Sequence, residues 1–174
     1  MKGLVEIVKG DLSKKRHYRA LIRLINAYRI HPMGGRLPTL SSQAETELVK
    51  GLKNNRNAVI LFAQYGKTIM GLAVCFLGFS TFSAKPLINV HDLIVSSRFR
   101  RRGIGKTIME AIVRKATMRG CCRVTLEVRS DNSVAKRFYK KIGFGPCLAP
   151  MEFWAKTIET RPPRITERGK NETC

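Results

Sequence analysis

A stretch of ten residues, "RFRRRGIGKT" at positions 98–107, gathers cationic side chains around two glycines. Its cations are Arg98, Arg100, Arg101, Arg102 and Lys106, and no acidic residue lies among them. Glycine lets backbone N–H groups approach a ligand closely, and arginine and lysine both bind phosphate. The stretch therefore predicts a loop that binds a phosphorylated anion.

Three phosphate-binding motifs can be compared with this loop. A Walker A motif, G-x-x-x-x-G-K-[ST], ends as Gly105-Lys106-Thr107 does, but it needs a glycine where Arg100 stands. A dinucleotide-binding motif, G-x-G-x-x-G, needs a third glycine where Ile108 stands. The pattern Arg-x-x-Gly-x-Gly, which starts at Arg100, fits without exception. At the start of a helix, the positive end of the helix dipole would add to the attraction for a pyrophosphate.

Turn residues and hydrophobic periodicity place this loop between a strand and a helix. Asp11 is expected to cap the first helix, whose apolar residues recur between Tyr18 and Tyr28, and a capping box of Ser42 and Glu45 is expected to begin the second. Strands are expected at 3–8, 58–64, 68–80, 87–95, 122–128 and 151–158, and two further helices at 103–120 and 131–143. This order predicts an α/β domain with a mixed sheet.

The composition indicates one globular domain with a strongly basic surface. The chain has 174 residues, 44% of them hydrophobic, and a formal net charge of +21 at pH 7. This charge predicts attraction to polyanions such as nucleic acid, and it disfavours a highly cationic substrate. The five cysteines include no C-x-x-C pair, so neither a disulfide framework nor a zinc site is indicated, and reduced thiols in the cytoplasm are expected. The most apolar run, at 69–79, is too short to span a membrane.

Two segments, "VSSRFRRRGIGKTIM" and "LEVRSDNSVAKRFYKKIGF", resemble the signatures of the GNAT superfamily of acetyl-CoA-dependent N-acetyltransferases. Other segments, among them "HPMGGRLP", are similar to one bacterial subgroup of that superfamily. The resemblance implies a GNAT-like α/β fold, in which about four helices flank a mixed, mostly antiparallel central sheet. It covers residues 1–158 as a single domain and leaves 159–174 as a basic polar tail. Arg101 departs from the pattern, because many members have glycine there.

The resemblance also implies how acetyl-CoA would be held as a co-substrate, with no metal. The backbone of Leu93, Ile94 and Val95 would hydrogen-bond the pantetheine arm and polarise the thioester carbonyl. The residues assigned to the pyrophosphate and its surroundings are Arg100, Arg101, Arg102, Gly103, Ile104, Gly105, Lys106 and Thr107. The excess arginines could instead reach the ribose phosphate of the cofactor or face water.

Tyr139 matches the general acid of the family. It lies two helical turns after Asn132, so both side chains are expected to face the cofactor, and Lys136 is assigned to the same cofactor site. A tyrosine with the reference pKa of about 10 is protonated at neutral pH and can donate to a developing thiolate. The alternative is that Tyr139 is only an aromatic residue at an interface.

His91 is the candidate general base. Side chains alternate along a strand, so His91 is expected on the same face as Leu93 and Val95, with Asp92 on the opposite face. A histidine titrates near neutrality and suits deprotonation of an amine, directly or through water. The alternative is a hydrogen-bonded histidine at the edge of the sheet. The other two histidines, at 17 and 31, are interpreted as surface groups.

The resulting expectation is an enzyme that transfers an acetyl group to a primary amine of a small molecule or a protein. The alternative is a basic, nucleic-acid-associated protein that uses the GNAT fold as a scaffold. The resemblance places the acceptor pocket between the loop that joins the first two helices and the final strands, and it permits a homodimer. The candidate lining residues are Met33, Gly34, Gly35, Phe79, Thr81, Phe82 and Trp154.

Overall fold

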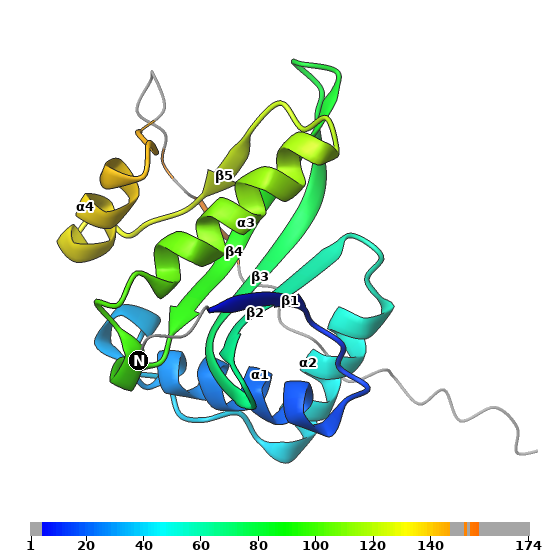
Figure 1. Cartoon of the computed structure of the whole chain (residues 1–174), viewed down its shortest axis with the longest axis vertical. Helices are drawn as coiled ribbons and strands as arrows, with labels where there is room; N and C mark the ends of the chain where they lie inside the picture. The colour runs from blue at the N-terminus through cyan, green and yellow to red at the C-terminus, as the bar shows by residue number, and fades with distance from the viewer. Residues whose placement is uncertain (1–4, 147–151, 153, 157–174) are drawn as a thin grey trace, which may run out of the picture.

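The computed structural model describes residues 5–146, 152 and 154–156, which fold around one five-stranded sheet (Figure 1). The strands are β1 (Glu6–Lys9), β2 (Ala58–Tyr65), β3 (Thr68–Ser80), β4 (Lys85–Val95) and β5 (Val124–Leu126). The helices are α1 (Lys15–Arg29), α2 (Ser42–Asn54), α3 (Ile104–Met118) and α4 (Ser133–Lys141), with short 3-10 turns η1 (Pro32–Gly34) and η2 (Ser97–Phe99).

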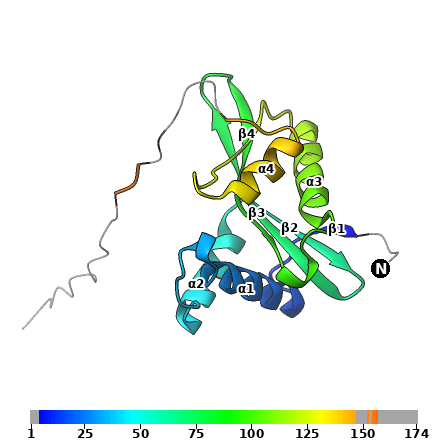
Figure 2. The same ribbon diagram turned by 90° about the vertical axis from the view of Figure 1, so that its left-hand side faces the viewer.

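The sheet has the order β1-β2-β3-β4-β5, and only its last pair of strands is parallel. This confirms the prediction of a mixed, mostly antiparallel sheet with four flanking helices. Helices α3 and α4 lie on one face, while α1 and α2 cover the other (Figure 2). Because both faces are covered, β2 and β3 are nearly continuous apolar runs instead of alternating ones.

Some sequence predictions concern parts of the chain outside the described residues. Of the strand expected at 151–158, the structure describes only 152 and 154–156, and these four residues lie in no strand. The boundary expected at residue 158 and the basic tail at 159–174 lie outside the described residues. These expectations therefore stay predictions.

Both helix caps predicted on the α1–α2 side are wrong. Helix α1 begins after Lys14, and the carboxylate of Asp11 instead accepts hydrogen bonds from the backbone and hydroxyl of Ser13, in a turn before the helix. Helix α2 is capped by Ser41, whose Oγ accepts from the backbone N–H of Ala44 at 3.2 Å. There is no capping box, because the Glu45 carboxylate accepts a hydrogen bond from the side chain of Asn26 at 3.2 Å and so joins α2 to α1.

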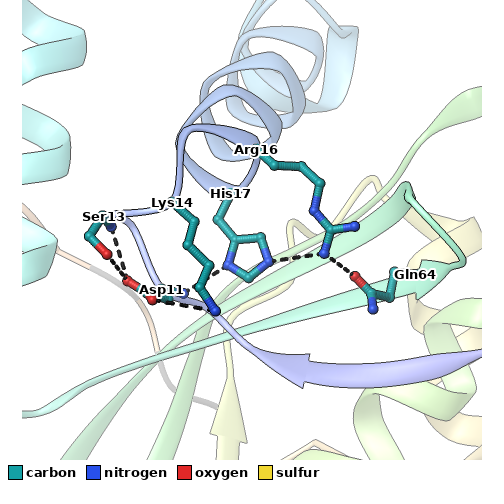
Figure 3. Close-up of polar contacts among 6 residues, drawn as sticks. All are labelled: Asp11, Ser13, Lys14, Arg16, His17 and Gln64. Atoms are coloured by element: carbon teal, nitrogen blue, oxygen red, sulfur yellow. Dashed lines mark hydrogen bonds and ion pairs between the residues drawn. The ribbon is translucent and has the colours of Figure 1, made fainter.

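His17 is buried, so its interpretation as a surface group is wrong. Figure 3 shows its ring between Asp11 and Arg16. Its Nδ1 accepts a hydrogen bond from the backbone N–H of Asp11 at 3.0 Å, and its ring packs against Phe62 with 5.0 Å between ring centroids. Burial, together with the neighbouring charges of Arg16 and Lys14, lowers the pKa of His17. A neutral His17 therefore fastens the chain before α1 to the sheet. The other histidine, at 31, caps η1.

Candidate active site

A β-bulge in β4 decides which way the candidate base points. In the register of β3 and β4, Cys75 lies opposite Val90 and Val74 lies opposite Asp92, so His91 is an extra residue on β4. The ring of His91 packs edge-on against Phe76, with 5.6 Å between ring centroids, and Phe76 belongs to the core under α1 and α2.

The bulge corrects the predicted orientation of His91. Leu93 and Val95 pack into the core under α3, whereas His91 lies on the α1–α2 face. Asp92 is opposite Val74, which also belongs to the α1–α2 core, so Asp92 shares a face with His91. The extra residue interrupts the two-residue alternation on which the prediction relied. His91 is exposed and Asp92 half-buried; burial raises the pKa of Asp92, and the nearby His91 acts in the opposite direction.

Strands β4 and β5 separate beyond the bulge. They pair only between 88–90 and 124–126, so in the described part of the chain no strand pairs with residues 91–95 on the β5 side. The backbone N–H of Ser96 donates to Met70 on β3 at 2.9 Å. Alternate residues of an antiparallel strand bond to the same neighbour, so Ile94 pairs with β3, while Leu93 and Val95 direct their N–H and C=O groups toward the open edge.

The predicted anion-binding loop connects this open edge to α3. Helix α3 begins at Ile104 after Gly103, which has a φ of 80° and provides no side-chain cap, and its first turn holds no acidic residue. The first N–H groups of a helix have no acceptor within the helix, so those of Ile104, Gly105 and Lys106 can bind an anion. A Cβ on Gly105 would lie 3.3 Å from the ring of Phe138, so this glycine also allows close packing of α3 against α4.

The basic side chains of the loop differ in what they contact. Arg100 Nε donates to the carbonyl oxygen of Val95 at 3.2 Å and so ties the loop to the end of β4. The guanidinium of Arg102 lies 5.9 Å from the centroid of the Phe99 ring. Lys106 and Glu110 form an exposed ion pair at 3.8 Å, and Arg101 is exposed with a φ of 63°. The left-handed backbone at Arg101 is a physical reason for glycine at this position.

Helix α4 carries the candidate acid Tyr139. The Tyr139 ring packs against Phe138 and Phe144, with 5.1 and 6.1 Å between ring centroids. Burial raises the pKa of Tyr139 to about 12, and the nearby Tyr28 acts in the same direction. Within the described part of the chain its hydroxyl makes no hydrogen bond, so it can donate to a ligand.

Two other residues assigned to the cofactor from the sequence make contacts within the protein. The Asn132 side chain caps α4, because its Oδ1 accepts from the N–H of Ala135 at 3.1 Å. Lys136 Nζ donates to the carbonyl oxygen of Ser130 at 3.2 Å. Asn132 therefore fixes the start of the helix that carries Tyr139, and its assignment to the cofactor stays a prediction.

The α1–α2 side of the site contains residues that sequence reasoning did not single out. Tyr28, at the end of α1, donates from its hydroxyl to the carbonyl oxygen of Met33 at 3.2 Å and lies near Tyr139. Asn89 Nδ2 donates to Thr125 Oγ1 at 3.3 Å and to Glu127 Oε1 at 3.1 Å, across β4 and β5. A polar Asn89 within an apolar strand was the available signal. The proposed lining residues Phe79, Phe82 and Trp154 are exposed in the described structure, and the acceptor pocket that they would line stays a prediction.

Neither a metal centre nor a membrane span is found among the residues that the structure describes. No three His, Cys, Asp or Glu side chains gather there as metal ligands. None of the helices in the described ranges is long and apolar enough to cross a bilayer. The described cysteines, at 75, 121 and 122, carry unpaired thiols.

The mixed five-stranded sheet, with helices on both faces and a parallel last pair of strands that separates beside the uncapped start of α3, defines an α/β protein. Residues 24–144 match the profile of the acetyltransferase (GNAT) family. The chain belongs to that family.

A curated relative agrees with this assignment, and two solved structures share the fold. A [ribosomal protein bS18]-alanine N-acetyltransferase of Haemophilus ducreyi is 30% identical over 95 residues, which cover 53% of this chain and 61% of that protein. This chain thus spans less than two thirds of that relative. The structure of a possible acetyltransferase from Clostridium difficile 630 has a TM-score of 0.75 at 16% identity and covers 89% of this chain and 99% of its own. A soil-metagenome aminoglycoside acetyltransferase in complex with sisomicin has a TM-score of 0.73 at 23% identity, over 88% and 97%.

Proposed function

We propose that this protein transfers the acetyl group of acetyl-CoA to a primary amine of a small molecule or a protein. The observation that carries the proposal is the position of the uncapped α3 start beside the unpaired edge of β4. The relatives named for their acceptors act on a ribosomal protein alanine in one case and on aminoglycosides in another, and both acceptors are amines. We also propose a cytoplasmic location, which suits the reduced thiols, and a homodimer by analogy with the family.

The residues at the open edge fit acetyl-CoA as a co-substrate. The outward N–H groups of Leu93 and Val95 would hydrogen-bond the pantetheine arm and stabilise the oxyanion that forms on the thioester carbonyl. The first N–H groups of α3 and the arginines of the loop would bind the pyrophosphate. Ile94, assigned to the same contact from the sequence, would support it through its pairing with β3.

The acetyl transfer needs one proton removed and one supplied. A neutral amine attacks the thioester carbon, and the C–S bond of the resulting adduct breaks. Tyr139 donates its proton to the leaving thiolate and recovers a proton from solvent. The amine proton passes to His91, directly or through water, with Asp92 on the same face of the bulge. This assignment keeps the candidate acid and base of the sequence prediction.

A two-part measurement tests this function. Acetyl-CoA is expected to raise the melting temperature by mass action. At a hundred times its Kd, it should raise the free energy of unfolding by about 2.7 kcal/mol. An amine panel of amino acids, peptides, polyamines and aminoglycosides is then screened for release of the CoA thiol. Cys122 is exposed, so a protein blank without acetyl-CoA corrects for its own reaction with the thiol reagent. The proposal would be contradicted if acetyl-CoA caused no thermal shift and no amine caused release of the CoA thiol.

Arg101→Gly is expected to weaken acetyl-CoA binding without much change in the stability of the protein. Glycine relieves the left-handed backbone at a cost of about 0.5–1 kcal/mol in chain entropy, so the melting temperature changes little. Loss of one cation weakens acetyl-CoA binding about fivefold, or ~1 kcal/mol, which calorimetry measures. Arg101→Gln, the control, loses the same charge but keeps a side chain at this backbone position. A clear drop in melting temperature for the glycine variant alone would show that the loop does not favour glycine here.

A further inference from the structure

A basic hollow lies between α1 and the β2–β3 turn, away from the acetyl-CoA residues on the α3 face. Its volume is about 390 Å³, and Ile69 and Ala20, both buried, form its floor. The side chains around it are those of Lys15, Arg16, Arg19, Arg23 and Lys67, all of them exposed. Lys67 is far from the other four in the sequence, and only the packing of the β2–β3 turn beside α1 brings the five cations together.

Two of these arginines are held in place by hydrogen bonds. Arg16 Nη2 donates to Gln64 Oε1 at 2.7 Å (Figure 3). Its Nη1 lies 3.5 Å from the carbonyl oxygen of Gly66. Arg23 Nη2 donates to the carbonyl oxygen of Ile69 at 2.9 Å. A guanidinium has five N–H donors, and the hydrogen bonds within the protein leave at least two donors of Arg16 and four of Arg23 for another partner. The two charges are therefore positioned before any ligand arrives.

No carboxylate lines the hollow among the residues that the structure describes. Glu6 accepts a hydrogen bond from Gln64 at 3.1 Å, behind Arg16, and Asp11 is engaged by Ser13 and by Lys14 at 3.7 Å. The first turn of α1 also holds no acidic residue, so the positive end of its dipole adds to the field. Five like charges converge without compensation, and an anion would relieve their repulsion.

The arrangement of the arginines favours a chain of phosphates over a single one. Arg16, Arg19 and Arg23 lie at helical spacing on one side of α1, in a row of about 10 Å. No aromatic side chain lines the hollow in the described structure, so there is no surface on which a base could stack. Contacts to phosphates alone bind nucleic acid without reading its sequence. We propose that the basic hollow binds the phosphate backbone of a nucleic-acid strand.

The inference is independent of the acetyltransferase function. The hollow lies on the α1 face, although its residue Ile69 is next to Met70, which accepts the hydrogen bond from Ser96 just before the anion-binding loop. Because of this proximity, acetyl-CoA could also occupy the hollow, and the experiment must distinguish its binding from that of RNA. RNA binding is therefore measured without acetyl-CoA, and a failure to detect acetyl transfer leaves the result intact.

The test uses a labelled single-stranded RNA oligonucleotide and the full chain, with fluorescence anisotropy from about 0.05 M to about 0.2 M salt. The variant R19Q/K67Q removes two cations whose side chains make no hydrogen bond or ion pair within the described structure. It is expected to weaken binding and to reduce the slope of log affinity against log salt by about 1.4, or ~0.7 for each lost phosphate contact. K50Q/K53Q, on the exposed side of α2, removes the same two charges and is expected to leave the slope nearly unchanged.

Three outcomes would overturn the inference. Equal weakening by both double variants would show that the overall charge attracts RNA, with no local site. Binding of inorganic tripolyphosphate without binding of RNA would assign the hollow to small polyphosphates. A loss of acetyl-CoA affinity in R19Q/K67Q would assign it to the cofactor. Melting temperatures of all variants show that each is folded.

Discussion

Replacing Tyr139 by phenylalanine is expected to lower kcat for acetyl transfer by about 100-fold, the lower end of the usual contribution of a general acid. The change removes one hydroxyl and keeps the ring that packs against Phe138 and Phe144. The thiolate must then leave without a positioned proton donor. Acetyl-CoA should still raise the melting temperature of the variant nearly as much as that of the wild type, because the pyrophosphate and pantetheine contacts come from other residues.

The pH dependence and a control variant sharpen this test. Because the pKa of Tyr139 is raised to about 12, the tyrosine keeps its proton through neutral and mildly alkaline pH, so its ionisation produces no decline of kcat in that range. Tyr65→Phe removes a hydroxyl from an exposed tyrosine at the end of β2 and should leave kcat unchanged. If Tyr139→Phe retained wild-type kcat, Tyr139 would be an interfacial aromatic, and another group or water would protonate the thiolate.

Gly34→Ala is expected to destabilise the protein by about 3 kcal/mol, at the upper end of the cost of overpacking. A Cβ on Gly34 would overlap the carbonyl oxygen of Tyr28 and approach its carbonyl carbon to 2.7 Å. Backbone atoms at the end of α1 cannot turn aside as a flexible side chain can, so the α1–η1 turn must shift. The expected fall in melting temperature is about 6–12 °C for a chain of this size, measured by thermal unfolding.

The same substitution should also report on the acceptor side of the site. The shifted turn would carry Met33 away from its hydrogen bond with Tyr28, so the acceptor KM should rise more than the KM for acetyl-CoA. Gly51→Ala is the matched control, because a Cβ on this glycine of α2 meets nothing within 4 Å. Alanine in a helix interior should stabilise the protein by about 0.5–1 kcal/mol. A melting temperature for Gly34→Ala equal to that of the wild type would show that the turn accepts a side chain.

The order of the elements as far as α4, and the glycine-containing turn that begins α3, could be predicted from the sequence because their signals are local. Helical and strand periodicity, and the glycines at 103 and 105, require only neighbouring residues. The bulge at His91 could not, because it is a property of the register between β3 and β4. The capping box expected from Ser42 and Glu45 also failed because of a tertiary contact, since Glu45 accepts a hydrogen bond from Asn26 on another helix.

The burial of His17 and the clustering of the basic side chains around the hollow could not be predicted from neighbouring residues either. A histidine between Arg16 and Tyr18 gives no sign that its Nδ1 meets the backbone of Asp11 in the core. The basic hollow joins α1 to Lys67, some fifty residues later, and depends on how the β2–β3 turn packs beside the helix. Such contacts follow from the tertiary fold, which brings together residues that are far apart in the sequence.

The separation of β4 from β5 connects the binding of acetyl-CoA with the tendency of the protein to aggregate. Beyond the bulge, β4 changes from an interior strand to an edge strand within the described part of the chain. Unpaired strand edges are templates on which another chain can add a strand, and they are a recurrent origin of aggregation. A pantetheine arm bonded to Leu93 and Val95 would occupy that template as a surrogate strand. Bound acetyl-CoA would then protect the protein from aggregation through this edge.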